Sequence, residues 1–146
     1  MINNLLSSID KNCKDLKDIT IISRTHGQPA SPTKLGKEFR VFWTRITNQL
    51  STLKKIPNSA KFAGAVGNFN AHKVAYPKID WKEFGQNFIE NELNLNYSFP
   101  TTQIEHYDSL AALFDNCRRI NNILLDMCLD IWLSLIHISE PTRPLS

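Results

Sequence analysis

The sequence has few of the features that would assign a chain to a specialised class. Its three cysteines, Cys13, Cys117 and Cys128, are in no CxxC or Cys/His metal spacing, and their odd number argues against a disulfide framework. No apolar run reaches the length of a membrane span, and residues 1–11 lack the pattern of a signal peptide. The net charge is only +3, with no dense Lys/Arg block. We therefore expect a cytoplasmic protein with reduced cysteines and no metal, nucleic-acid or membrane partner.

Apolar residues at helical spacing are abundant. The chain has 146 residues, the size of one domain, and 42% of them are hydrophobic. Apolar positions recur at three- and four-residue steps in three segments, within residues 2–16, 35–53 and 110–131. No internal repeat or low-complexity tract interrupts them. The pattern predicts an all-α fold with helices long enough for a bundle.

Capping signals predict where the helices begin. Ser31 followed by Pro32 is typical of an N-cap and first turn, so the second helix is expected to begin there and to end near Pro57. Residues 80–83, DWKE, form a capping-box pattern that opens a short helix. Residues 102–105, TQIE, form another, which is expected to open the longest helix.

The last fourteen residues differ in character. Residues 133–146, LSLIHISEPTRPLS, break the apolar stripe and resemble the translated read-through of an adaptor used to prepare sequencing libraries. If so, the native reading frame is truncated near Trp132. We therefore expect a partial helical domain over residues 1–132 and a non-native tail over 133–146. His137 lies in that tail and receives no role.

The segment ITIISRTHGQPASP contains the sharpest catalytic candidate, His26. Its β-branched start favours an extended backbone, and the glycine and prolines that follow forbid a helix, so a short extended loop is expected. Imidazole has an unperturbed pKa near neutrality, which suits it to proton transfer. Gly27 leaves room for a ligand, and Pro29 and Pro32 restrict the loop. A surface or structural role for His26 stays open.

The segment TTQIE, residues 101–105, supplies a second candidate, Gln103. In the first turn of a helix it would lie beside free backbone N–H groups, which suit an anionic or amide ligand. A purely structural role is the alternative. GAVGN, residues 64–68, lacks the ending of a P-loop and is interpreted as a tight turn. His72 and His106 have no metal-ligand partner at usable spacing, although His106 could share the helix face of Gln103.

Three segments in this order, RTHGQPASPTKLGKE, GAVGNFNAHKVAYPKIDW and TTQIEHYDSLAALFD, resemble the adenylosuccinate lyase family of the aspartase/fumarase superfamily. The resemblance runs from about Ile21 to Trp132. A threonine-histidine loop followed by glutamine and proline is common to the superfamily. The second and third segments are more particular, and they favour the adenylosuccinate branch over fumarase, aspartase or argininosuccinate lyase.

The resemblance implies elimination of fumarate from adenylosuccinate, giving AMP, and from the succinylated carboxamide ribonucleotide of purine synthesis. It implies that His26 is the general acid for the departing nitrogen, and that Gln103 and Thr25 contact the substrate. No cofactor and no metal are implied. The implied fold is the central helical domain of a homotetramer.

The family's catalytic serine loop and amino-terminal domain have no counterpart in this sequence, so we expect the chain itself to be inactive. Two alternatives stay open. One is a non-catalytic helical assembly module in which His26 is structural. The other is a different fumarate-releasing lyase of the superfamily.

Overall fold

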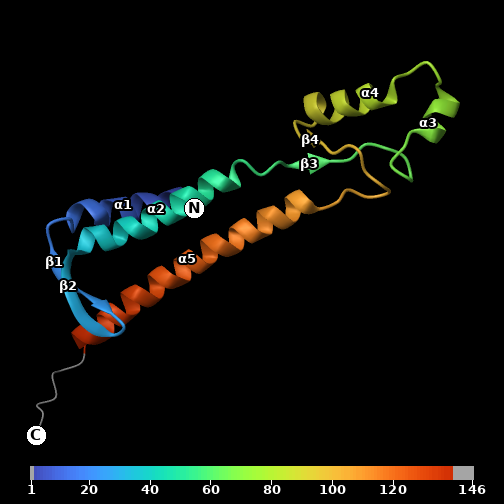
Figure 1. Cartoon of the computed structure of the whole chain (residues 1–146). Helices are drawn as coiled ribbons and strands as arrows, with labels where there is room; N and C mark the ends of the chain where they lie inside the picture. The colour runs from blue at the N-terminus through green and yellow to red at the C-terminus, as the bar shows by residue number, and fades with distance from the viewer. Residues whose placement is uncertain (1, 140–146) are drawn as a thin grey trace, which may run out of the picture. The chain divides into compact units, whose positions relative to one another are not determined.

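The computed structural model describes residues 2–139, with side chains described as far as Leu133. The chain divides into two compact units, whose elements are labelled in Figure 1. The first unit contains the residues up to Thr52 and those from Asn116 onward. The second unit is Leu53–Asp115.

The first unit has an apolar core between three helices. These are α1 (Ile2–Asp15), α2 (Leu35–Leu53) and the part of α5 (Asp108–Ser139) that belongs to this unit. The predicted helices at the first two stripes are confirmed, and the second ends at Leu53, close to the predicted end. The buried side chains of the core come from all three helices: Ile9, Cys13, Phe42, Ile46, Ile123 and Met127.

The expectation of a purely helical fold is wrong in the segment after α1. Strands β1 (Thr20–Thr25) and β2 (Gln28–Lys34) pair antiparallel. β-branched residues favour the extended backbone of β1. Proline is tolerated in β2 because a two-stranded ribbon consists only of edges. The chain is therefore mostly helical, with a β-hairpin where a loop was predicted.

Helix α2 begins later than the capping signal predicts. Ser31 and Pro32 lie within β2, paired with β1, and the Ser31 carbonyl accepts a hydrogen bond from Ser23 Oγ at 2.5 Å. The first two N–H groups of α2 need no side-chain cap, because backbone carbonyls satisfy them. The amide of Leu35 donates to Ile19 O, at 2.9 Å. In the same way the amide of Gly36 donates to Leu16 O, at 3.0 Å.

The second unit combines short elements with aromatic packing. Strands β3 (Ser59–Ala60) and β4 (Asn96–Tyr97) pair in parallel. Between these strands in the chain lie helices α3 (Asn70–Ala75) and α4 (Trp81–Asn87), and a π-helical turn, η1 (Phe88–Glu92), continues from α4. Five rings share close contacts in this unit: Phe62, Phe69, His72, Phe84 and Phe88.

The two capping boxes have different outcomes. Asp80 caps α4 as predicted, and its carboxylate accepts from the amides of Lys82 and Glu83, both at 3.0 Å. The box at residues 102–105 is wrong, because α5 begins at Asp108. Glu105 instead accepts from the Tyr107 amide at 2.6 Å, and the positive φ of Tyr107, 64°, interrupts any helix before that point.

The last residues of α5 overlap the predicted tail, residues 133–146. The backbone of this helix is continuous to Ser139, and residues 140–146 of the predicted tail lie outside the described residues. The side chain of His137 is likewise not described. The tail assignment and the truncation near Trp132 therefore stay predictions. Among the described residues, no helix combines the length and apolarity needed to cross a bilayer.

Candidate functional site

His26 occupies the tip of the β-hairpin. Thr25 pairs with Gln28, so His26 and Gly27 are the two central residues of a two-residue turn. Their φ values are 52° and 75°, the signs that a type I′ hairpin turn requires at both central positions. Histidine tolerates this left-handed region better than most non-glycine residues do. The turn thus presents an exposed imidazole on a short, conformationally restricted support, which is a hairpin rather than the predicted loop.

Contacts along the hairpin fix the position of that turn. Near its base the Lys34 ammonium donates to the Asp18 carbonyl at 2.9 Å and to Thr20 Oγ1 at 2.8 Å. The Thr33 hydroxyl donates to a Glu38 carboxylate oxygen at 3.1 Å, which ties β2 to α2. The register shifts between Ile22 and Arg24. The base of the hairpin is therefore anchored by these hydrogen bonds, and the turn at His26 extends from that base.

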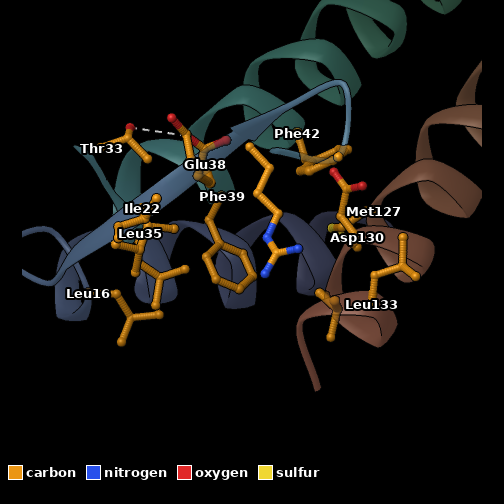
Figure 2. A pocket seen from close by; sticks show the side chains of 15 residues that line it. Leu16, Ile22, Thr33, Leu35, Glu38, Phe39, Phe42, Met127, Asp130 and Leu133 are labelled. Carbon is orange, nitrogen blue, oxygen red and sulfur yellow. Dashed lines mark hydrogen bonds between the residues drawn. The ribbon is translucent and has the colours of Figure 1, made fainter. Parts of the chain in front are cut away.

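A cleft of about 670 Å³ lies beside the hairpin within the first unit. Figure 2 shows Ile22 and Leu35 on one side of it and Asp130 and Leu133 on the other. Its lining is mainly aliphatic and aromatic, with Arg24, Glu38 and Asp130 as the charged members. Gly27 belongs to the lining of this cleft. Among the described residues that line it, Thr25 and His26 are absent, so the cleft and the histidine are separate features of the hairpin.

Gln103 lies in the second unit, on the irregular segment before α5 rather than in a helical turn. Its side chain is exposed, while its carbonyl oxygen accepts a hydrogen bond from Lys61 Nζ. The same ammonium donates to the Gly64 carbonyl at 3.1 Å. The predicted sharing of a helix face with His106 is therefore wrong, because residue 106 precedes the helix. Gln103 instead lies in a loop whose main chain is hydrogen-bonded by Lys61, which is distant in the sequence.

The segment GAVGN, predicted as a tight turn, lies against the segment TTQIE. The amide of Gly67 donates to Gly64 O at 3.0 Å, and the amide of Gly64 donates to Asn68 O at 2.8 Å, which closes the turn. A Cβ added to Gly67 would collide with the Thr101 carbonyl oxygen. Sequence reasoning missed this contact, although a glycine with a φ of 80° is the kind of residue that close backbone approach requires.

The remaining histidine of the second unit, His72, is part of the aromatic packing. Its ring makes edge contacts with Phe62, Phe69 and Trp81, and its buried Nδ1 has no partner among the described residues. Across the described part of the chain, no three His, Cys, Asp or Glu side chains are grouped so as to hold a metal ion. Of the predicted site residues, Thr25 and His26 share one turn, and Gln103 belongs to the other unit.

Comparison with known proteins gives the family. A family model described as "Lyase" matches residues 1–141. The chain belongs to this lyase family. A crystal structure of a fumarate lyase from Mesorhizobium sp. BNC1 superposes with a TM-score of 0.70 at 20% identity, covering 92% of this chain and 32% of that one. That likeness concerns the fold alone, and it agrees with the predicted long-helix architecture.

Curated relatives of this chain are more similar to it in sequence. The adenylosuccinate lyase of Dictyostelium discoideum is 47% identical over 131 residues, covering 88% of this chain and 28% of the relative. The adenylosuccinate lyases of Vibrio cholerae and Escherichia coli K12 are 41% and 40% identical, covering 97% and 94% of this chain. The chain spans 31% and 30% of the length of these two relatives.

Proposed function

We propose that this chain is a segment of an adenylosuccinate lyase, which eliminates fumarate from adenylosuccinate and from the succinylated aminoimidazole carboxamide ribonucleotide. The observation that carries the proposal is its identity of 40–47% with three proteins of that name over 88–97% of the chain. The fold likeness to a fumarate lyase agrees with a fumarate-releasing reaction. The substrate is therefore a purine nucleotide or its biosynthetic precursor.

In this proposal His26 is the general acid. A base outside this chain removes a proton from the succinyl carbon beside a carboxylate, and the carbanion is stabilised as an aci-carboxylate. The electron pair then forms the double bond of fumarate as the bond between carbon and nitrogen breaks. The imidazolium of His26 gives its proton to the departing nitrogen, which leaves as a neutral amine. The exposed hairpin tip supports this role, because a ligand can approach the ring.

Thr25 and Gln103 are proposed as substrate contacts. Thr25 immediately precedes the acid at the tip of the hairpin, and both residues are exposed, so a ligand can reach each of them. The amide of Gln103 offers both donors and an acceptor to carboxylate or base groups. Its exposure and the anchoring of its backbone by Lys61 support a binding role. No metal and no organic cofactor enter the proposed reaction.

Assembly into a homotetramer in the cytoplasm is part of the same proposal. Large apolar side chains of α5 are exposed in the first unit, where Leu125, Leu129 and Trp132 are 61%, 51% and 58% exposed. Such surfaces suit burial against other helices of an oligomer. The three cysteines are free, which agrees with a reducing compartment.

The test is to recover the complete gene, purify its product and follow fumarate release. We expect turnover of adenylosuccinate and no turnover of argininosuccinate or aspartate. The 146-residue chain alone should show none, because the base and most substrate contacts lie elsewhere. Activity of the complete protein on argininosuccinate instead would replace this proposal with another lyase of the superfamily. A fold without any lyase activity would favour the assembly module.

A further inference from the structure

Lys61 joins two loops that are far apart in the sequence. Its ammonium donates to the carbonyl oxygen of Gly64 at 3.1 Å and to that of Gln103, which lies 42 residues further along the chain. The side chain leaves the chain immediately after β3, which pairs with β4 and so gives it a fixed origin. A single cation thus holds the main chain of a proposed substrate-binding residue.

The loop on which Lys61 rests is itself rigidly built. Gly64 and Gly67 close the turn by backbone hydrogen bonds, and the turn packs so tightly on the Thr101 carbonyl that only glycine fits at position 67. Gly67 also has a φ of 80°, which a side chain would disfavour. The two loops therefore touch at Thr101 and are linked by Lys61 two residues later.

The segment after Gln103 is held by hydrogen bonds to the carboxylate of Glu105. The Glu105 carboxylate accepts from the Tyr107 amide at 2.6 Å and from Ser98 Oγ at 3.2 Å. Gln103 thus lies between two anchored points, at Thr101 and at Glu105. Without Lys61, the main chain of Gln103 would keep none of the side-chain hydrogen bonds that are described for it.

Among the described residues, Lys61 forms no ion pair with a carboxylate. The two hydrogen bonds described for its ammonium therefore go to neutral carbonyl oxygens, and they orient a backbone rather than neutralise a charge. We infer that Lys61 is a positioning residue, which holds the Gln103 backbone so that the exposed amide side chain is presented to the substrate. This inference rests on the proposed function of Gln103.

The experiment compares variants of the complete lyase in a double-mutant cycle. In the active enzyme, Lys61→Met should raise KM for adenylosuccinate by about tenfold and change kcat by less than about threefold, because a binding contact is misplaced. In the Gln103→Ala background the same change should have no further effect on KM, because it acts through that residue. Lys61→Arg, which keeps a cationic donor, should restore KM to within about threefold. Lys54→Met, an exposed lysine of the same unit, is the matched control.

Amide hydrogen exchange of the same proteins supplies a readout independent of activity. Lys61→Met should speed exchange in peptides covering residues 64–68 and 101–105, while Lys54→Met should not. If Lys61→Met does not assemble, Lys61→Gln, which has a shorter side chain and no charge, takes its place in the cycle, with KM expected to change in the same direction.

Each outcome separates the inference from the function on which it rests. Multiplicative KM effects of Lys61→Met and Gln103→Ala would overturn the positioning role while leaving Gln103 as a contact. Unchanged exchange at residues 101–105 would overturn it as well. An unchanged KM in Gln103→Ala alone would overturn the role of Gln103 and, with it, that of Lys61.

Discussion

The two loops that carry the proposed site residues are held in different ways. The turn at His26 is held by its own hairpin, since each paired residue of β1 and β2 lies within fifteen positions of its partner. The loop at Gln103 is held by residues from Lys61 to Gly67, about forty positions away. The comparison teaches that a support built from neighbouring residues leaves a partial signal in the sequence, here β-branched residues followed by glycine and prolines, whereas a support built across the chain leaves none.

The largest expected effect tests the chemical role of the hairpin turn. In the complete lyase, His26→Ala should lower kcat by about two to four orders of magnitude, because general acid catalysis contributes on that scale. The fold should be unchanged, since the imidazole is exposed and makes no described hydrogen bond. Circular dichroism and fumarate release measure the two quantities.

A matched histidine sharpens this result. His106→Ala changes an exposed histidine beside the other loop and should leave kcat within about threefold. A kcat for His26→Ala within tenfold of the wild-type value, with assembly intact, would assign the acid to another group.

The next effect compares the two loops directly, by adding a methyl group to a glycine in each. Gly67→Ala should lower the free energy of unfolding by about 2–4 kcal/mol, because the Cβ meets the Thr101 carbonyl in addition to the cost of positive φ. Gly27→Ala should cost about 1 kcal/mol, because only the conformational term applies and no atom lies within 4 Å of the added Cβ. Urea unfolding measures both. Equal costs would contradict the packed character of the second loop.

The smallest effect concerns the helices beneath the hairpin. Hydrogen bonds from Lys14 and Arg40 lower the pKa of the Asp10 carboxyl below its usual value. A lowered folded-state pKa contributes stability above the unfolded-state pKa, which is about 3.9, and this contribution is lost as the pH falls through the folded-state value.

Asp10→Asn should therefore lower the melting temperature slightly at pH 7, with the difference disappearing in acid. Thermal unfolding between pH 7 and pH 2 measures it. Asp126→Asn, which removes the exposed partner of Arg45 in the same unit, is the control for a general loss of ion pairs. A difference that persists at the acid end would contradict the assignment to Asp10.

Sequence periodicity predicted the helices because their stripes are local and contribute to one core. The second stripe, through Phe42 and Ile46, is buried as expected. The stripe of the longest helix was only partly right, since Ile120 and Met127 are buried but Leu110 and Phe114 are exposed. An apolar residue on a helix can be buried against its own chain or be available to pack against another chain. Periodicity does not distinguish these two cases.

Two capping signals mispredicted the start of a helix, because the same residues form other hydrogen bonds or strand pairs in the structure. Ser31 and Pro32 suit a helix start, but the hairpin recruits them as strand residues and the helix receives its first hydrogen bonds from backbone carbonyls. Glu105 suits a capping box, but its carboxylate binds Tyr107 N and Ser98 Oγ instead. The role of Lys61 had no local signal, because a lysine after a two-residue strand resembles any surface charge.

The bonds from Leu35 and Gly36 back to Ile19 and Leu16 have a consequence for how this region can vary. They join the residues before β1 to the first turn of α2 through main-chain atoms, so this link does not depend on the side chains of residues 20–34. A substitution of a side chain within residues 20–34 should therefore leave the first residue of α2 unchanged, which separates the chemistry of the hairpin from the placement of the helix.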